Sequence, residues 1–546
     1  MKHRLPGPAL GGLALSLAGV ALSVVPSAPA VAATPGTLTE PARHAADWLT
    51  GELTNGLIFN NQFDFTDYGR SIDVGLALAA AGRSTTVTQI ADALAPNVGD
   101  YYSYSVGSSG TKTHVLAGSL AKAAVFARIA GKNPLDFGGR DLLSELEGRV
   151  STDTASAGRI GDVFFPEEQF EADYANTFGQ AFAARALSEA GSTLAPSALA
   201  FLDAQQCSGG WIRLDLGATL AGTCDEEGGL PSIDATANAI INLVDVPAAA
   251  DLVDGAVAWL KGAQREDGSY PAGDGLNNSN ANSTGLAAQA LGLAGETAAA
   301  ADAATWLRTY QADDVAPCIT AMTPERGAVA YEPGALATAR VDGIAETVED
   351  QFRFATAQAL GGLLYADDRQ PTSEPTSNAT FVRAGSLQNI DVTGVAPGRT
   401  LCVVRVSDGQ TKLLNADPEG NASPIVRAGR PDRSQDVRFR IKLGTEVLGV
   451  VTLRALAPTS FVVQAPARAS RRDGVVVTVT GLAPGERGLV RVLRGDKAVG
   501  KSRRADADGV LKVRVALTDL PLGKAVIRVQ GFFDDRRGSK ALRITR

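Results

Sequence analysis

Polar residues that could hold or transform a ligand recur at one kind of place, just before or within the first turn of Ala- and Gly-rich helical stretches. Carboxylates and amides there could bind a small molecule or a glycan, and a close carboxylate pair could cleave a glycosidic bond by acid–base catalysis. The same residue types cap helices, because their oxygens accept hydrogen bonds from free N–H groups of the first turn. Both interpretations stay open from sequence. The candidates are Asp64, Asp67, Tyr68, Asp73, Asp173, Tyr174, Asn176, Gln180, Asp234, Asp274, Asn280, Asn282, Asp350 and Gln351.

Histidine is scarce, which narrows the catalytic classes. The chain holds three histidines, and only His44 and His114 follow the N-terminal leader. Ser-His-Asp and Cys-His hydrolase centres and a His-containing zinc site are therefore disfavoured. No Gly-rich loop ending in Lys-Ser or Lys-Thr precedes a helix, so a phosphate-binding loop is not expected. We expect no metal, no cofactor and no nucleic-acid partner.

The helical stretches belong to a repeated unit within residues 40–369. Most units begin with an aromatic-Leu pair, and the aromatic residues are Trp48, Phe201, Trp259 and Trp306. A glutamine follows the last three by five positions, at Gln206, Gln264 and Gln311. The clearest copy predicts a helix over 256–264, a polar loop, and a second helix over 283–293.

The second helix of each unit is rich in Ala and Gly on all sides, which predicts burial with close helix contacts. These stretches lie at 71–82, 175–187, 232–243, 282–295 and 352–364, and a further helical pair lies at 117–131 and 141–150. The first helices carry more charge and are expected outside. Two-helix units bury their apolar faces only by stacking, and buried inner helices with polar starts favour a closed ring over an open solenoid.

The run from Gln264 to Tyr270, with its Gln, Gly, Ser and Tyr, resembles the Gln-Gly-aromatic motif of prenyltransferase and squalene-oxidase repeats in exported bacterial proteins. Gln206 to Trp211 is a second copy. The resemblance covers about 45–368. It implies the α/α toroid of squalene-hopene cyclases and protein prenyltransferase β-subunits, with the polar candidates ringing one mouth of a central cavity.

The enzymatic signatures of the resembled fold are missing from the sequence. No Asp-x-Asp-Asp cyclase motif lies on a predicted inner helix, and the zinc ligands of a prenyltransferase and a Cys-Gly-Glu-Gln thioester motif are also absent. Aromatic residues make up 6% of the chain, which is little for a cavity that stabilises cations. These departures favour binding over catalysis.

The composition changes after the helical part. Residues 370–378 read as a linker, and 379–458 and 459–546 read as two β-rich modules. The run VTGVAPGR at Val392 recurs as VTGLAPGE at Val479, and short alternating strands predict a tandem of Ig-like sandwiches. The run from Asp506 to Gly509 resembles part of a calcium loop but lacks the later Glu, so a hairpin turn is expected there.

Charge is unevenly distributed. Residues 1–370 hold 21 Lys and Arg against 43 Asp and Glu, a net charge of -22, whereas residues 459–546 hold 19 against 8, a net charge of +11. A basic tail on an acidic body predicts contact with an anionic cell-envelope polymer, and the alternative is a solvated basic surface.

The N-terminus predicts export. Lys2 and Arg4 precede an apolar run over 9–25 and small residues, so 1–32 reads as a cleaved signal peptide with no later membrane span, and an N-terminal anchor is the alternative. Cysteines in an exported chain suggest disulfides, and Cys207 and Cys224 are expected to pair across one loop. Cys318 and Cys402 either bridge the body to the first β-rich module or stay free.

The sequence therefore predicts a multidomain protein, with an all-α α/α toroid followed by two all-β Ig-like sandwiches. We expect a secreted or envelope-associated, non-catalytic protein that binds an unidentified small molecule or glycan in the toroid. Two alternatives stay open. One is a polysaccharide lyase, hydrolase or terpenoid cyclase-like enzyme that uses cavity carboxylates, and the other is a structural protein whose toroid is filled by its own side chains.

Overall fold

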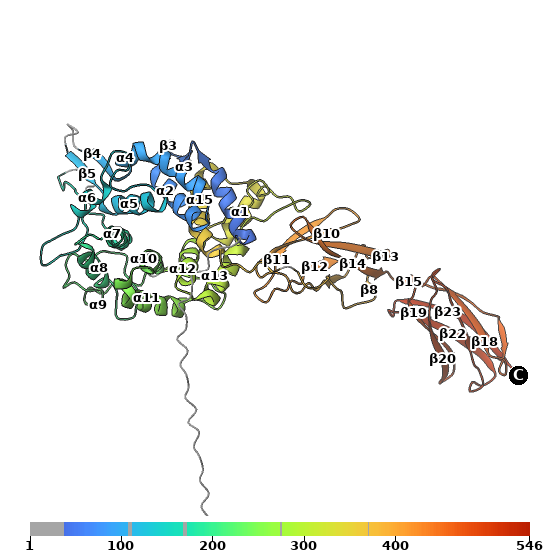
Figure 1. Ribbon diagram of the computed structural model, residues 1–546. Coiled ribbons are helices and arrows are strands. Elements are labelled where there is room, and N and C mark those ends of the chain that lie inside the picture. Colours follow the sequence, from blue (N-terminus) through green and yellow to red (C-terminus); the bar gives the residue numbers. More distant parts are fainter. Residues whose placement is uncertain (1–37, 107–111, 168–171, 274–275, 370) are drawn as a thin grey trace, which may run out of the picture.

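The computed structural model describes residues 38–106, 112–167, 172–273, 276–369 and 371–546, and its first part is helical while its C-terminal part is rich in strands (Figure 1). The predicted signal peptide lies outside the described residues, as does the candidate Asp274. Over the described ranges, no helix combines the length and apolar character that a membrane span requires.

Six helices of the described chain form an inner ring in which each packs against the next and the last packs against the first (Figure 1). They are α2 (Tyr68–Ala80), α5 (Ala117–Ile129), α7 (Thr177–Ala190), α10 (Ile233–Leu243), α12 (Ala281–Leu293) and α15 (Glu346–Leu363). Glycine permits the closest approaches: a Cβ on Gly179 of α7 would lie 2.6 Å from the Cα of Gly118 on α5. The contact between α15 and α2 closes the ring. A closed ring is what the sequence predicted from buried inner helices with polar starts.

An outer layer covers the ring, and each of its helices packs against one or two inner helices. These are α1 (Glu40–Gly51), α3 (Ser84–Leu94), α6 (Leu142–Glu147), α8 (Ala195–Asp203), α11 (Ala250–Ala263) and α13 (Thr297–Thr309). Short helices and hairpins fill the connections: α4 (Val98–Tyr102), α9 (Cys224–Glu227), α14 (Pro333–Asp342), the sheet β1 (Leu53–Thr54), β2 (Leu57–Asn60) and β3 (Phe65–Asp67), and the hairpins of β4 (Ser103–Val106) with β5 (Lys112–Val115) and β6 (Pro271–Gly273) with β7 (Leu276–Ser279).

Two helix starts differ from the sequence prediction. Helix α11 begins at Ala250, six residues before the predicted start, because the 3₁₀ turn Pro247–Ala249 leads directly into it. Helix α12 begins at Ala281, two residues early, because the Asn280 side chain accepts a hydrogen bond from the Ser283 N–H at 2.9 Å and caps the helix there.

The repeat glutamines share one hydrogen-bonding pattern. Each side-chain Nε2 donates to the carbonyl of a nearby glycine and to a carbonyl in the outer helix of the next unit. Gln206 reaches Gly210 and Leu252, both at 2.9 Å, and Gln264 reaches Gly268 at 3.1 Å and Ala299 at 2.9 Å. The motif that carried the family resemblance therefore joins neighbouring units.

The same turns place a backbone N–H against a threonine of an inner helix. Ile212, Tyr270 and Val329 donate to the hydroxyls of Thr236, Thr284 and Thr356 at 2.9, 3.0 and 2.8 Å. Each donor lies two residues after the glycine that the unit's glutamine contacts. Gly210 is thus the counterpart of Gly268, and Ile212 is the counterpart of Tyr270. Trp211, the last residue of the predicted second copy, therefore does not correspond to Tyr270. Trp211 packs instead against Trp259, with ring centroids 6.1 Å apart.

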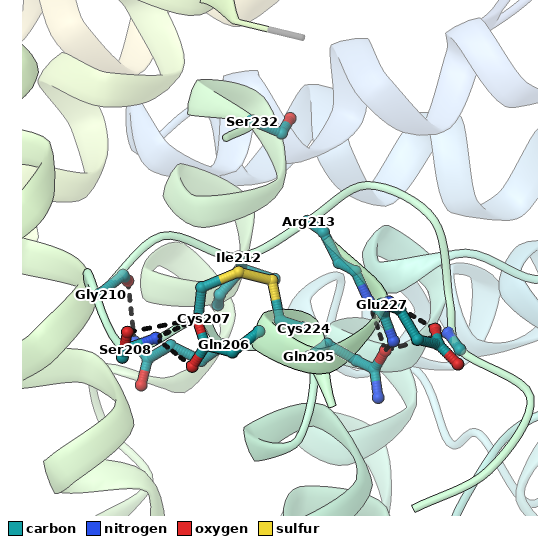
Figure 2. The surroundings of a disulfide bond; sticks show 12 residues. Gln205, Gln206, Cys207, Ser208, Gly210, Ile212, Arg213, Cys224, Glu227 and Ser232 are labelled. Atoms are coloured by element: carbon teal, nitrogen blue, oxygen red, sulfur yellow. Dashed lines mark hydrogen bonds and ion pairs between the residues drawn. A yellow bond between two sulfur atoms is a disulfide. The ribbon is translucent and has the colours of Figure 1, made fainter. Parts of the chain in front are cut away.

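The predicted disulfide between Cys207 and Cys224 is present, with Cα atoms 4.9 Å apart (Figure 2). The loop between them folds over buried polar groups. The Gln205 Oε1 accepts hydrogen bonds from Arg213 Nη2 at 2.7 Å and from the Gly217 N–H at 2.9 Å, and Arg213 also pairs with Glu227 at 2.6 Å (Figure 2). The disulfide thus restrains an irregular segment, and the hydrogen bonds to Gln205 and the ion pair of Arg213 restrain it as well.

The first β-rich unit forms a five-stranded sheet in the order β11-β10-β13-β14-β8 and a small sheet of β12 and β9. Its strands are β8 (Val382–Arg383), β9 (Leu387–Asn389), β10 (Thr400–Arg405), β11 (Thr411–Asn415), β12 (Ile425–Arg427), β13 (Gln435–Leu443) and β14 (Glu446–Leu456). Buried and exposed residues alternate along β13, so one face packs on a core of its own and the other faces solvent.

The second β-rich unit has one sheet in the order β15-β23-β22-β19-β20, with β17 also beside β23, and another in the order β16-β18-β21. Its strands are β15 (Thr459–Ser460), β16 (Val462–Gln464), β17 (Arg468–Ser470), β18 (Val475–Thr480), β19 (Arg487–Arg494), β20 (Lys497–Arg504), β21 (Leu511–Val515), β22 (Gly523–Gln530) and β23 (Arg536–Thr545). The turn at Asp506–Gly509 joins β20 to β21, which pair in different sheets, so it is not the predicted hairpin. The Asp506 side chain accepts hydrogen bonds from the Asp508 and Val510 N–H groups and closes the turn.

Covalent and ionic contacts join the parts. Cys318 and Cys402 form a disulfide between a loop of the helical part and β10, with Cα atoms 5.9 Å apart, which settles the alternative left open by the sequence. Nearby, Arg399 pairs with Glu40 of α1 at 2.8 Å. Between the β-rich units, the buried Arg536 of β23 donates to the Ser434 hydroxyl at 3.2 Å and to the Ala457 carbonyl at 2.5 Å.

Candidate functional site

The inner ring encloses a cavity of about 670 Å³. All six inner helices contribute to its wall, so it lies on the axis of the ring. Its apolar lining includes Phe178, Phe182, Ile241, Leu286 and Phe354. A cavity of this size accommodates a drug-sized molecule, since typical ligand pockets measure roughly 300–1,000 Å³. The described ring is therefore not filled by its own side chains.

A network of charged side chains occupies the wall between α2, α5 and α15. Lys122 pairs with Asp73, and Arg70 pairs with the other oxygen of Asp73 at 3.3 Å and with Asp350 at 3.0 Å. The Arg70 guanidinium also lies 3.9 Å from the ring centroid of Phe354. Burial acts to lower the pKa of Lys122, but Asp73 and Tyr101 outweigh it and the pKa is raised, so the ammonium keeps its charge.

Amide side chains form a second polar group on the wall, which we call the amide belt: Asn238 and Asn242 of α10, Gln289 of α12 and Gln358 of α15. Asn242 is 4% exposed and donates to the backbone and side-chain oxygens of Asn238 at 2.9 and 3.1 Å. The Oδ1 of Asn242 and the Oε1 of Gln358 are buried and have no hydrogen-bond partner among the described residues. Such acceptors are costly to bury alone, so the belt is suited to a ligand that donates hydrogen bonds.

One end of the cavity is bordered by the starts of α5 and α7. Asp162 lines it and accepts hydrogen bonds from the Ala117 N–H at 2.7 Å and the Tyr174 N–H at 2.9 Å. Burial raises the pKa of Asp162. Tyr174 also lines the cavity and is 53% exposed, so it marks an opening to solvent. His114 is fully buried and packs edge-on against Tyr104, with ring centroids 4.8 Å apart.

The opposite end carries a second charged group. Arg185 and Glu189 of α7 line the cavity and pair at 2.9 Å, and Glu189 also pairs with Arg128 at 3.3 Å. Asp245 and Val246, beyond the end of α10, complete this rim. Charged and apolar surfaces therefore alternate along the cavity axis.

Three of the sequence candidates line the cavity, namely Asp73, Tyr174 and Asn176. Asp350 is linked to Asp73 through Arg70 but does not line it. Asp173, beside the Tyr174 opening, pairs with Arg159 at 2.7 Å. The structure thus brings these five candidates to two regions in or beside the wall.

The other candidates among the described residues lie outside the cavity wall. Asp67 and Asn280 cap α2 and α12, and Asn176 combines its place in the wall with capping α7. Gln180 is fully buried, and its amide donates to Gly158 and Ala198, as the repeat glutamines donate to a glycine and an outer helix. Its Oε1 accepts from the Ile160 N–H. Asp64 lies in the turn between β2 and β3, and Gln351 is exposed on α15. Tyr68, Asp234 and Asn282 are half-buried in the first turns of α2, α10 and α12.

Sequence reasoning missed the residues that dominate the wall: Lys122, Asn238, Asn242, Gln289 and Gln358. They lie in the middle and last turns of the inner helices, whereas the search concentrated on helix starts. One signal was present, because Asn238 and Asn242 are four residues apart in a helix whose second half is otherwise apolar, and so they share one face.

Solved structures that are similar to the chain include terpene cyclases and bacterial adhesins. The type II terpene cyclase MstE from Scytonema, without ligand, has 17% sequence identity and a TM-score of 0.39, covering 59% of this chain and 96% of that chain. A variant of MstE in complex with geranylgeranyl dihydroxybenzoate has 17% identity and a TM-score of 0.40, covering 60% and 96%. The adhesin InvE of Yersinia pseudotuberculosis has 14% identity and a TM-score of 0.19, covering 32% of this chain and 58% of that chain.

No protein-family model matches the chain, and no curated protein matches it. Likeness at this level of identity concerns the fold alone, since one fold serves many functions. The chemistry of the cavity therefore has to be interpreted from its own residues.

Proposed function

We propose that the helical ring binds a small molecule in its central cavity and releases it chemically unchanged. The ligand has an apolar body that packs against Phe178, Phe182 and Phe354, and at least one hydroxyl or N–H group that donates to the amide belt. One observation carries the proposal. Asn242 and Gln358 line the cavity, and each has a buried side-chain oxygen with no hydrogen-bond partner among the described residues.

The arrangement of the acids supports binding rather than catalysis. A group that protonates a substrate must present a free O–H, but both carboxylate oxygens of Asp73 are occupied, one by Lys122 and one by Arg70. Glu189 is likewise held by two arginines. Asp162 accepts two backbone hydrogen bonds that hold the loop at the cavity opening. These three acids thus have positioning roles in the wall.

The proposal extends to the rest of the chain. Export is supported by the signal-like leader and by two disulfides, which persist in oxidising surroundings. The two β-rich units, each with its own core and two sheets, act in this proposal as Ig-like modules that hold the ring at the cell surface. The helical pairs are in this view copies of the prenyltransferase and squalene-oxidase repeat.

The proposal is tested by purifying the exported chain and identifying retained small molecules by extraction and mass spectrometry. The variant Asn242→Leu with Gln358→Leu removes the amide belt's unpartnered acceptors at nearly constant volume. Gln351→Leu, an exposed change on the same helix as Gln358, is the matched control. Wild type and control should retain the same compound, and the double variant should lose at least nine-tenths of it. Retention by all three proteins, or by none, contradicts the proposal, and conversion of the compound on incubation would identify an enzyme instead.

A further inference from the structure

Antiparallel strands of the larger sheet in the second β-rich unit carry three pairs of like charges in which both side chains are exposed. Arg487 of β19 lies opposite Arg504 of β20, Arg491 of β19 lies opposite Arg528 of β22, and Lys524 of β22 lies opposite Arg543 of β23. Residues directly opposite on antiparallel strands have Cβ atoms roughly 4.5–5.5 Å apart, and like charges at such positions are destabilising. All six side chains are exposed.

The six cations share the outward face of the sheet. Along β19 and β22 the buried residues Val490, Val492, Ile527 and Val529 alternate with the basic ones and pack into the core. Because side chains alternate between the two faces of a strand, the cations all point to the solvent side. We call the set Arg487, Arg491, Arg504, Lys524, Arg528 and Arg543 the basic face.

Nothing in the described chain neutralises the basic face. The four strands that carry it contain no Asp or Glu, and no ion pair joins any of its six residues to an acid of the described residues. Glu486, which precedes β19, is buried and pairs with Arg536. The six cations of the basic face repel one another, and the fold supplies no counter-charge for them. Binding of an external anion relieves this repulsion.

We propose that the basic face binds a linear polymer of phosphodiesters. Five of the six residues are arginines, whose planar guanidinium forms two parallel hydrogen bonds to an anionic group. A phosphodiester presents two unesterified oxygens, so the opposed guanidiniums of Arg491 and Arg528 can each take one. The three cation pairs lie on four adjacent strands, and they offer successive sites to a chain that runs across the sheet.

The composition of the face favours such a polymer over a nucleic acid. Proteins that bind single-stranded nucleic acids stack bases on aromatic side chains, and the four strands contain no Phe, Tyr or Trp. The phosphodiester backbone of the polymer is therefore the group that the face recognises.

The test measures binding of synthetic poly(glycerol phosphate) to the full exported chain across a series of salt concentrations. The variant Arg491→Thr with Arg528→Thr removes the central pair and keeps strand-forming residues. The matched control, Lys512→Thr with Arg514→Thr, removes the same charge from exposed positions of β21 in the other sheet. At about 100 mM salt the test variant should bind at least tenfold more weakly than wild type, and the slope of log K against log salt should fall by about one to two. The control should bind within about twofold of wild type.

A structural role for the pair predicts a different result. If Arg491 and Arg528 stabilised the fold, the test variant would melt at a lower temperature, whereas relief of repulsion leaves the melting temperature unchanged or higher. The proposal is overturned if test and control variants lose affinity equally, or if wild type shows no binding to poly(glycerol phosphate). It is also overturned if polygalacturonate, single-stranded DNA or phosphatidylglycerol vesicles bind more tightly than poly(glycerol phosphate).

Discussion

The side-chain amide of Gln311 donates a hydrogen bond to the backbone carbonyl of Pro41, 2.9 Å away and 270 residues earlier in the chain. Gln206 and Gln264 make the corresponding bond to the next outer helix along the sequence. Gln311 is the last copy, and its next outer helix is α1, the first of the chain. The same repeated contact therefore both propagates the ring and closes it.

Replacing Gln311 by Leu should destabilise the helical ring by about 2–3 kcal/mol, because the buried carbonyls of Pro41 and Gly327 both lose their donor. Denaturant unfolding followed by circular dichroism measures the change. Gln351→Leu removes an exposed amide and should change stability by less than about 0.5 kcal/mol. Equal effects of the two substitutions would show that ring closure does not depend on this bond.

Gly268→Ala should cost about 2 kcal/mol more than Gly295→Ala. Both glycines have positive φ, +84° and +86°, so the backbone penalty is shared. A Cβ at Gly268 would lie 2.4 Å from the Asp302 carbonyl oxygen, whereas a Cβ at Gly295 meets nothing within 4 Å. The difference in unfolding free energy isolates the close contact, and a difference near zero would mean that the outer helix moves away without cost.

Stability should fall between pH 6.5 and 4 in a manner that depends on His44. Burial, and then the charges of Arg326 and Arg43, lower the pKa of His44 to about 4. The unfolded chain takes up the proton at higher pH than the folded chain, so the stabilisation is complete above about pH 6.5 and is lost as the pH falls toward 4. The loss amounts to at most about 3 kcal/mol. His44→Gln should remove this part of the pH dependence. If the free energies of unfolding of wild type and variant decrease in parallel as the pH falls, other groups cause the wild-type slope.

Lys122 and Asp73 should behave as a coupled pair. Lys122→Met leaves Asp73 with Arg70 alone at the cavity wall and should cost about 3 kcal/mol, as does breaking other buried pairs. Adding Asp73→Leu should recover at least about 1 kcal/mol, since no uncompensated carboxylate then remains. A double-mutant cycle measures the coupling energy, and strictly additive losses would contradict the interpretation of these residues as one network.

The candidates at helix starts show which features of the structure a local sequence pattern can predict. Asp67, Asn176 and Asn280 lie before helices as expected, because a cap depends only on the next three residues of the chain. The ion pair of Arg70 with Asp350 could not be read from the sequence, because 280 residues separate its members. The third copy of the turn motif was hidden for a related reason: its glycine, Gly327, follows Gln311 by sixteen residues instead of four.

Local pattern was enough to predict the helical pairs, the repeated glutamine, the alternating strands of the β-rich units and the bridge between Cys207 and Cys224, because each follows from periodicity or from residues close in the chain. Long-range packing determined which side chains meet across the ring. The middle turns of six helices converge on one axis, and this convergence assembles the cavity from Lys122, Asn242 and Gln358, which no local signal connects. It also decided that Arg491 and Arg528 are opposed, because strand pairing and register depend on long-range packing of the sheet.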